Sequence, residues 1–275
     1  MKNLLVVLAV LAHTNLVCLG QVVENSTPAT TNISQKQCPC IMPDNSVVFR
    51  VNAPDAHNLQ IDLGKKYNME KGADGLWTVR TDPVEPGFHY YFLIIDGVPV
   101  ADPASQSFFG TGKMTSGIDI PEKGVDFYSV RDVPHGAVSS RIYYSKVTGS
   151  FRRLFVYTPP GYDQNPEKSY PVVYLQHGGG EDETGWVVQG KTDLVMDNLI
   201  AEGKAIPMIV VMANGNVSSG IGGYSSEAMT SFKNEMTQNI IPFIDKNYRT
   251  LDNVKNRAIC GLSMGGGQSF YVGLQ

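Results

Sequence analysis

The sequence lacks the features of several common classes of protein. It has four cysteines in 275 residues, which are too few for a disulfide scaffold, and Cys38-Pro39-Cys40 is too tight for an easy disulfide. Two thiols are also too few to hold zinc, so we expect no metal and no cofactor. The net charge is −4, without acidic or basic blocks. The composition therefore gives no support for nucleic acid or an anionic membrane as a partner, and it leaves the oligomeric state open.

The apolar run near the N-terminus, residues 4–12, is too short to span a membrane. With Lys2 before it and the small-residue stretch Cys18-Leu19-Gly20 after it, this run predicts an export signal over residues 1–20. We therefore expect a secreted or periplasmic protein. A lipoprotein acylated at Cys18 is the alternative, but Leu16-Val17 is a poor lead-in for it.

The first half of the chain contains short strand-like stretches separated by turn residues. These stretches are residues 47–51, 59–63, 76–79 and 90–95. Their spacing predicts a small all-β, immunoglobulin-like sandwich over residues 41–122. The polar residues 21–40 before it predict a flexible linker, and residues 123–140 a connector.

Three aromatic residues of this half, Trp77, Tyr90 and Tyr91, have the chemistry to stack on sugars. Aromatic residues in short strands are usually buried, however. We therefore expect these three side chains to fill the core of the sandwich.

The second half, residues 141–275, has the pattern of an α/β fold. Continuous apolar runs indicate buried strands, and helical periodicity falls between them. The runs are residues 171–176, 208–213 and 257–261, and the helices are residues 193–202 and 227–248. Such alternation implies a parallel sheet covered on both sides. Pro242 is expected to kink the second helix.

The motif G-x-S-x-G stands between the last predicted strand and a further predicted helix. Its residues are Gly261-Leu262-Ser263-Met264-Gly265. A strand, a glycine-flanked turn and a helix form the context in which this motif holds the nucleophilic serine of an α/β-hydrolase. The turn strains the serine backbone, and the glycines let strand and helix approach closely. The sequence thus predicts Ser263 as a nucleophile, and Cys260 before it as a small buried residue.

The glycine run His177-Gly178-Gly179-Gly180 follows the first of the predicted parallel strands. Acyl transfer passes through a tetrahedral oxyanion, which backbone N–H groups stabilise. In an α/β-hydrolase one N–H belongs to the residue after the nucleophile, here Met264, and another to an upstream glycine loop. We expect Gly179 to supply the second N–H, with Gly178 as second choice and His177 as a brace. Trp186 either lines an acyl or sugar pocket or belongs to the core.

The acid and the base that a serine nucleophile needs do not follow Ser263. The chain order in α/β-hydrolases is serine, acid, histidine, but the 12 residues after Ser263 contain no Asp, Glu or His. We therefore expect the parallel sheet of this α/β-hydrolase to be C-terminally incomplete. Loss of a triad member costs about 10⁴-fold to 10⁶-fold in rate, so the chain as given is expected to be close to inactive.

Motifs in both halves resemble known families. Phe49-Arg50-Val51-x-Ala53-Pro54 and Asp74-Gly75-x-Trp77 resemble the early-set immunoglobulin-like domain of the CBM48 type. Val156-Tyr157-Thr158-Pro159-Pro160-Gly161-Tyr162, Gln176-His177-Gly178 and the G-x-S-x-G motif resemble the esterase D-like carbohydrate esterases. That group includes the feruloyl esterases of carbohydrate esterase family 1, and the match covers about residues 45–275.

The resemblance implies a secreted serine esterase that releases hydroxycinnamic acids from feruloylated arabinoxylan, a plant cell-wall polysaccharide. It implies an acyl-enzyme at Ser263 and an oxyanion hole of Met264 and Gly179. An acetylxylan esterase or another carbohydrate esterase is the alternative within the same class. A non-catalytic carbohydrate-binding relic is the alternative from another class, and an Asp and a His in a continuing reading frame would distinguish the enzyme from it.

Overall fold

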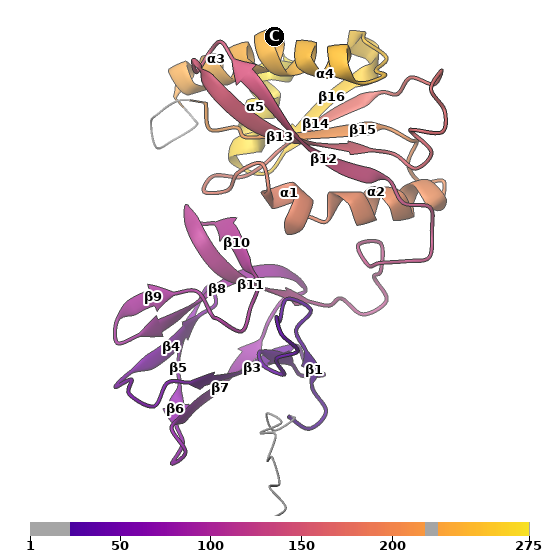
Figure 1. The fold of residues 1–275 in the computed structure, drawn as a ribbon. Helices are drawn as coiled ribbons and strands as arrows, with labels where there is room; N and C mark the ends of the chain where they lie inside the picture. The colour runs from indigo at the N-terminus through magenta and orange to yellow at the C-terminus, as the bar shows by residue number, and fades with distance from the viewer. Residues whose placement is uncertain (1–22, 218–224, 275) are drawn as a thin grey trace, which may run out of the picture.

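The computed structural model describes residues 23–217 and 225–274 of the chain. The expected export signal and Cys18 lie outside these residues, so they remain predictions. Among the described residues, no helix is both long and apolar enough to cross a membrane. An all-β region and a second region, in which helices cover a sheet, follow one another along the chain (Figure 1).

The all-β region is a sandwich of two sheets. One sheet has the order β1-β2-β3-β7-β6 and the other β10-β11-β8-β4-β5, with β9 beside β8. The strands are β1 Thr27–Pro28, β2 Cys40–Ile41, β3 Ser46–Asn52, β4 Leu59–Asp62, β5 Lys66–Asn68, β6 Glu70–Lys71, β7 Leu76–Pro83, β8 Gly87–Ile95, β9 Val98–Val100, β10 Ser107–Gly110 and β11 Lys113–Ile120. The four predicted strands are confirmed. Trp77 and Tyr91 lie in the core between the sheets, as expected for them.

The prediction of a flexible linker over residues 21–40 is wrong for the part that the structure describes. Strand β1 pairs with β2, Ala29 is buried in the sandwich core, and Asn32 forms a β-bridge with Ser105. The Asn32 amide also donates to the Lys36 and Pro39 carbonyls, both at 2.9 Å. Polar side chains that hydrogen-bond to nearby backbone let this segment pack without an apolar pattern, which is why its composition misled.

A connector without strands or helices, residues 121–136, leads from the sandwich to the second region. At its end, His135 Nδ1 lies 2.8 Å from one carboxylate oxygen of Asp197, and the Gly136 N–H donates to the other at 2.9 Å. The Tyr157 hydroxyl donates to the same carboxylate at 2.6 Å. Because Asp197 is only 2% exposed, this bonding anchors the connector on the second region.

The second region is built on one mixed sheet with the order β12-β13-β15-β14-β16. Its strands are β12 Ala137–Ser145, β13 Ser150–Thr158, β14 Val172–Gln176, β15 Ile209–Ala213 and β16 Arg257–Gly261. The last three are parallel neighbours, which confirms the three predicted strands. The prediction of burial is confirmed for β15 and largely for β14, but it is wrong for β16, which has no buried residue. The prediction of an all-parallel sheet is wrong for β12 and β13, which form an antiparallel hairpin beside β15. The short turn at residues 146–149 allows only an antiparallel connection.

Helices cover both faces of this sheet (Figure 1). They are α1 Gly185–Val188, α2 Thr192–Ala201, α3 Ser226–Glu235, the π-helical turn η1 Met236–Ile240, α4 Ile241–Asn247, the 3-10 turn η2 Val254–Asn256 and α5 Met264–Gly273. Helices α1 and α2 lie on one face, and α3, α4 and α5 on the other. Pro242, where the sequence predicts a kink, stands in the first turn of α4, directly after the π-helical turn.

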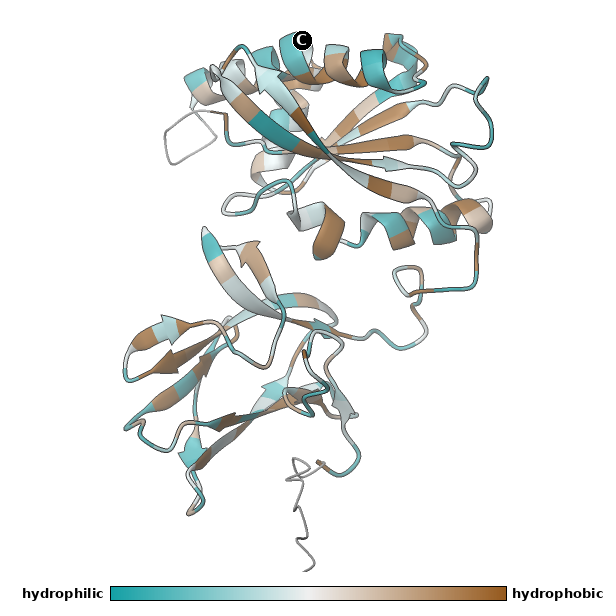
Figure 2. Ribbon diagram, viewed as in Figure 1, coloured by the Kyte–Doolittle hydropathy of each residue, from teal (hydrophilic) through white to brown (hydrophobic). Residues whose placement is uncertain are grey.

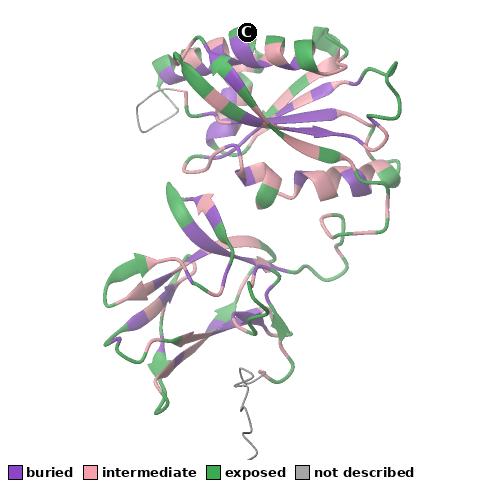
Figure 3. Cartoon of the chain, in the orientation of Figure 1, coloured by how far each residue is buried: buried purple, intermediate pink, exposed green. Residues whose placement is uncertain are grey.

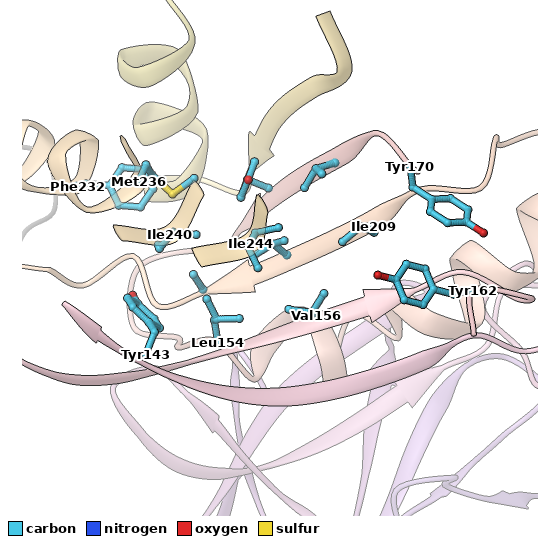
Figure 4. Packing of buried hydrophobic residues seen from close by; sticks show 14 residues of the cluster. Tyr143, Leu154, Val156, Tyr162, Tyr170, Ile209, Phe232, Met236, Ile240 and Ile244 are labelled. Atoms are coloured by element: carbon cyan, nitrogen blue, oxygen red, sulfur yellow. The ribbon is translucent and has the colours of Figure 1, made fainter. Parts of the chain in front are cut away.

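The apolar core of the second region lies between the sheet and the helical segment α3–η1–α4. Strands β14 and β15 are coloured as hydrophobic in Figure 2 and β15 as buried in Figure 3. Phe232, Ile240 and Ile244 project from the helical segment toward the sheet, where they meet Leu154 and Val156 (Figure 4). These residues are fully buried. The core therefore fixes β14 and β15 as the rigid centre from which the functional loops extend.

Strand β16 is the edge of the sheet among the described residues, with β14 as its one neighbour. Its residues alternate in exposure, and Ala258 and Cys260 are exposed. The prediction that Cys260 is buried is therefore wrong. Helix α5 packs on the other face of the strand, where a Cβ on Gly273 would lie 3.7 Å from Ile259, and no described element covers the face that carries Cys260.

Candidate active site

Ser263 lies in the turn between β16 and α5, in a backbone conformation that non-glycine residues rarely adopt. Its φ is 50° and its ψ is −110°. The flanking glycines explain how this turn fits: a Cβ on Gly265 would lie 2.6 Å from the Gln176 carbonyl oxygen and 2.7 Å from that of His177. A Cβ on Gly261 would lie 2.7 Å from the same Gln176 oxygen. The strand, strained turn and helix expected of the G-x-S-x-G motif are all present.

The loop after β14 begins in contact with this turn. We call residues 177–183 the glycine loop. The Leu262 N–H donates to the Gln176 carbonyl at 3.1 Å, and a Cβ on Gly178 would lie 3.5 Å from the Leu262 side chain. The structure therefore brings together the two segments that the sequence assigns to one site.

His177 braces the glycine loop from inside. The residue is 1% exposed, and its Nε2 accepts a hydrogen bond from the Gly215 N–H at 2.9 Å. The proton of a neutral ring must then be on Nδ1, which donates to the Gly178 carbonyl at 2.8 Å. Both ring nitrogens are engaged with backbone groups, so the structure agrees with the bracing role expected from the sequence.

Two backbone N–H groups of these segments, those of Gly179 and Met264, have no hydrogen-bond acceptor within the described part of the chain. The Gly178 N–H donates to Glu181 Oε2 at 3.2 Å and is occupied. The next N–H, that of Gly179, has no acceptor within the described part of the chain, and a Cβ there would meet nothing within 4 Å. The Met264 N–H is the first of helix α5, where N–H groups have no intrahelical acceptor. The geometry thus favours Gly179 over Gly178 as the predicted donor.

The far end of the glycine loop is bonded to strand β13 and to the residue that follows β15. Glu183, which is 7% exposed, accepts hydrogen bonds from Arg153 Nε at 2.7 Å and from Asn214 Nδ2 at 2.9 Å. Asp182 accepts from the Thr184 N–H at 2.8 Å and from its hydroxyl at 2.6 Å. Charge-assisted hydrogen bonds of this kind are the stronger ones, and they leave the loop little freedom.

Trp186 lies on α1, on the face of the sheet that α1 and α2 cover. Its indole N–H donates to the Gln176 carbonyl at 2.8 Å, and its ring packs against the cluster of Tyr157, Val210 and Met212. These contacts support the core alternative for Trp186. A contact between this side chain and a substrate stays a prediction.

The four described histidines are held by partners of their own. His135 is bonded to Asp197, and His177 to backbone, as above. His57 Nδ1 lies 3.7 Å from Asp96, and His89 Nε2 lies 2.7 Å from the Glu85 carbonyl, both within the sandwich. Within the described residues no group of three or more His, Cys, Asp and Glu side chains is arranged to hold a metal ion.

Sequence reasoning missed the contact between the sandwich and the glycine loop. The Tyr90 hydroxyl donates to Glu181 Oε1 at 2.8 Å, although the two residues are 91 positions apart. A cavity of about 280 Å³ lies at this junction, with Phe109 and Met114 on the sandwich side and Asp182 on the other. No local pattern marks such a contact, and Tyr90 was expected in the core.

Comparisons with known proteins identify similar sequences. Residues 145–275 match the family described as "Putative esterase". The endo-1,4-beta-xylanase/feruloyl esterase of Xylanibacter ruminicola is 41% identical over 265 residues, which are 92% of this chain and 36% of that protein. The chain thus spans about a third of the length of this relative.

Two solved structures extend the comparison. The enterobactin esterase FES of Shigella flexneri has a TM-score of 0.62 at 16% identity, over 83% of this chain and 67% of that one. A CE1 ferulic acid esterase of Anaeromyces mucronatus is 32% identical, with a TM-score of 0.46, over 56% of each chain. The first is a likeness of fold alone.

Proposed function

We propose that Ser263 is the nucleophile of a feruloyl-esterase-type reaction, because residues 145–275 match a family of esterases. The substrate would be a hydroxycinnamoyl ester of plant cell-wall arabinoxylan. The relative from Xylanibacter ruminicola, whose name includes feruloyl esterase, supports this choice of ester. We further propose that residues 1–20 direct the protein to the periplasm or the exterior.

The observation that carries the proposal is the strained conformation of Ser263, in a turn that contacts the glycine loop. Each of the two segments has an N–H group without an acceptor among the described residues. The Ser263 Oγ attacks the ester carbonyl carbon, and the carbonyl π electrons move to the oxygen. The Met264 and Gly179 N–H groups stabilise the resulting oxyanion, each by about 3–4 kcal/mol. When the tetrahedral intermediate collapses, the bond to the sugar oxygen breaks, the sugar leaves as an alcohol, and the acyl group stays on Ser263.

The serine proton needs a base, and the histidines of the described residues do not offer one. His177 uses both ring nitrogens for backbone contacts, and His135 is bonded to the buried Asp197. We therefore leave the base unassigned and infer that this chain by itself turns over esters slowly. Loss of a triad member lowers the rate about 10⁴-fold to 10⁶-fold, and we expect a reduction of this size relative to an esterase with a full triad.

The test is hydrolysis of methyl ferulate and p-nitrophenyl acetate by the chain, beside Ser263→Ala. Ser269→Ala is the matched control, because Ser269 lies on the same helix and donates only to the Gly265 carbonyl, at 2.6 Å. We expect weak turnover that Ser263→Ala abolishes and Ser269→Ala keeps. Turnover that survives Ser263→Ala would refute the nucleophile, and turnover at the rate of a complete esterase would show that these residues contain a base.

A further inference from the structure

The tip of a sandwich hairpin is bonded directly to the glycine loop. Strands β10 and β11 are joined by Thr111 and Gly112, and the Gly112 N–H donates to the Gly180 carbonyl at 2.8 Å. Gly180 has a φ of 81°, and a Cβ on it would lie 3.2 Å from both the Gly112 nitrogen and the Thr111 Cα. The close approach therefore depends on glycine at position 180. Figure 1 shows this hairpin extending toward the region of α1.

A second link runs through side chains. The Tyr90 hydroxyl, on β8, donates to Glu181 Oε1 at 2.8 Å and accepts from Gln189 Nε2 at 2.9 Å. Gln189 also donates to the Phe109 carbonyl, at 3.0 Å. Burial raises the pKa of Tyr90 well above its ordinary value, so the hydroxyl keeps its proton and remains a donor at neutral pH.

The position of the Tyr90 ring is itself fixed by the hairpin. A Cβ on Gly110 would lie 2.3–2.4 Å from ring carbons of Tyr90 and 2.6 Å from its hydroxyl oxygen, so the side chain packs closely against the backbone at the end of β10. Its edge contacts Phe88, with 5.1 Å between ring centroids. The hydroxyl is thus delivered to Glu181 from a rigid support.

Glu181 passes this support to the backbone of the glycine loop. While Oε1 accepts from Tyr90, Oε2 accepts from the Gly178 N–H at 3.2 Å. The Gly178 N–H is thereby turned toward Glu181, and the following N–H, that of Gly179, is left open. The Gly179 N–H belongs to the following peptide, whose carbonyl, that of Gly178, accepts from His177 Nδ1 at 2.8 Å and from the Glu181 N–H at 3.3 Å. Glu181 therefore holds both the peptide before the one that would bind the oxyanion and the carbonyl of that peptide, and the sandwich holds the Glu181 side chain.

We propose that Tyr90 is a positioning residue of the esterase, which acts through Glu181 to aim the Gly179 N–H at the oxyanion. The sandwich is then part of the catalytic apparatus rather than an independent module. This proposal rests on the proposed function, because it takes Ser263 as the nucleophile and Gly179 as an oxyanion donor. Misplacement of a donor by a fraction of an ångström costs rate without loss of the fold.

The test compares Tyr90→Phe with the full chain. Tyr67→Phe is the matched control, because Tyr67 lies on β5 and its hydroxyl donates only to Asp82, at 3.4 Å, within the sandwich. Phenylboronic acid is the probe, because its boron accepts a bond from Ser263 Oγ and the tetrahedral adduct places an oxygen where the oxyanion forms. Ferulate, which is planar at its carboxylate, reports ground-state binding.

We expect Tyr90→Phe to weaken boronate binding about tenfold, which is less than the roughly 100-fold to 1000-fold effect of losing an oxyanion donor outright. Ferulate affinity should not change, and amide hydrogen exchange should rise in peptides that cover residues 176–184. In Tyr67→Phe the boronate affinity, the ferulate affinity and the amide exchange should all stay unchanged. Tyr90→Phe and Glu181→Gln combined should cost less than the sum of the two single effects, because the residues act as one unit.

The outcomes separate this proposal from the proposed function. Unchanged boronate affinity in Tyr90→Phe would overturn the positioning role, whatever the exchange shows. If ferulate and boronate affinities fall equally, Tyr90 has a general structural role and the proposal is also wrong. If Ser263→Ala binds the boronate as tightly as the parent chain, the assignment of Ser263 as nucleophile is refuted instead. Unchanged amide exchange of the glycine loop in Tyr90→Phe would then also refute the support of this loop by Tyr90.

Discussion

Two segments meet at the candidate site, and they are held in different ways. The turn after β16 is fixed by its own backbone: Ser263 has a φ of 50°, and Gly261 and Gly265 fit against the end of β14. The glycine loop after β14 is held by side chains from distant parts of the chain. Tyr90 reaches it from the sandwich, and Arg153 from β13.

The difference predicts how each segment fails. A change in the serine turn introduces steric overlap with backbone that cannot move, so it should act on folding. A change in a contact of the glycine loop leaves the fold intact and shifts a hydrogen-bond donor, so it should act on chemistry. The largest effects on stability are therefore expected in the turn, and smaller ones along the contacts that reach the loop.

Gly265→Ala should have the largest effect. The new Cβ would lie 2.6 Å from the Gln176 carbonyl oxygen and 2.7 Å from that of His177. We expect a loss of at least about 3 kcal/mol in the free energy of unfolding, in the range of severe overpacking. Urea unfolding followed by circular dichroism measures it.

Gly273→Ala, on the same helix, is the control for that substitution. Its Cβ would meet only the Ile259 methyl group, at an ordinary contact of 3.7 Å. This variant should be as stable as the parent chain or slightly more so, since alanine favours a helix over glycine. Equal stability of Gly265→Ala and Gly273→Ala would show that the turn is not fixed by its backbone.

Gly180→Ala should have an intermediate effect, and it tests the loop side of the comparison. A left-handed conformation costs a residue with a Cβ about 1–2 kcal/mol, and here the Cβ also approaches the hairpin tip at 3.2 Å. Gly149→Ala is the control, because Gly149 has a φ of 63° with nothing near it.

Both variants should lose stability in urea unfolding from the left-handed conformation, and Gly180→Ala should lose more because of its close approach to the hairpin tip. Only Gly180→Ala should also increase amide exchange at the hairpin tip, residues 110–113. If Gly149→Ala loosens the hairpin tip equally, the close approach of Gly180 does not hold the two regions together.

The smallest effect is expected at the connector, where a contact depends on pH. The hydrogen bond to Asp197 raises the pKa of His135 above its ordinary value. A raised folded-state pKa means that the stabilisation is complete below the unfolded pKa of about 6.5 and is lost as pH rises through the folded value.

Amide exchange of residues 121–136 should therefore increase as pH rises from 6 to 8 beyond its intrinsic pH dependence. His135→Gln should remove this extra increase. An identical profile in the parent chain and in His135→Gln would contradict the role of the His135–Asp197 contact.

The sequence was informative where structure depends on neighbours in the chain. The G-x-S-x-G motif led to the correct strand, turn and helix, and apolar runs located β14, β15 and β16. The interruption at Pro242 also follows from a local cause, the missing N–H of proline. In each case the property that determines the structure lies within a few residues of the structure itself.

The wrong predictions concern features that depend on residues distant in the sequence. Residues 23–40 pack on the sandwich through backbone contacts with distant residues such as Ser105, in addition to the local hydrogen bonds of Asn32. Cys260 is exposed because no described element packs on its face of β16. The link from Tyr90 to Glu181 joins strand β8 to a loop 91 positions away. Nothing in the local pattern distinguishes a tyrosine that fills a core from one that supports a loop.

The central claim, that Ser263 is a nucleophile supported by the glycine loop, is tested most directly by trapping the acyl-enzyme. The chain is incubated with p-nitrophenyl acetate, and its peptides are mapped by mass spectrometry. We predict a single acetyl group on Ser263, absent in Ser263→Ala and slower to form in Tyr90→Phe than in Tyr67→Phe. Acetylation that is distributed over other side chains, with Ser263 unmodified, would contradict it.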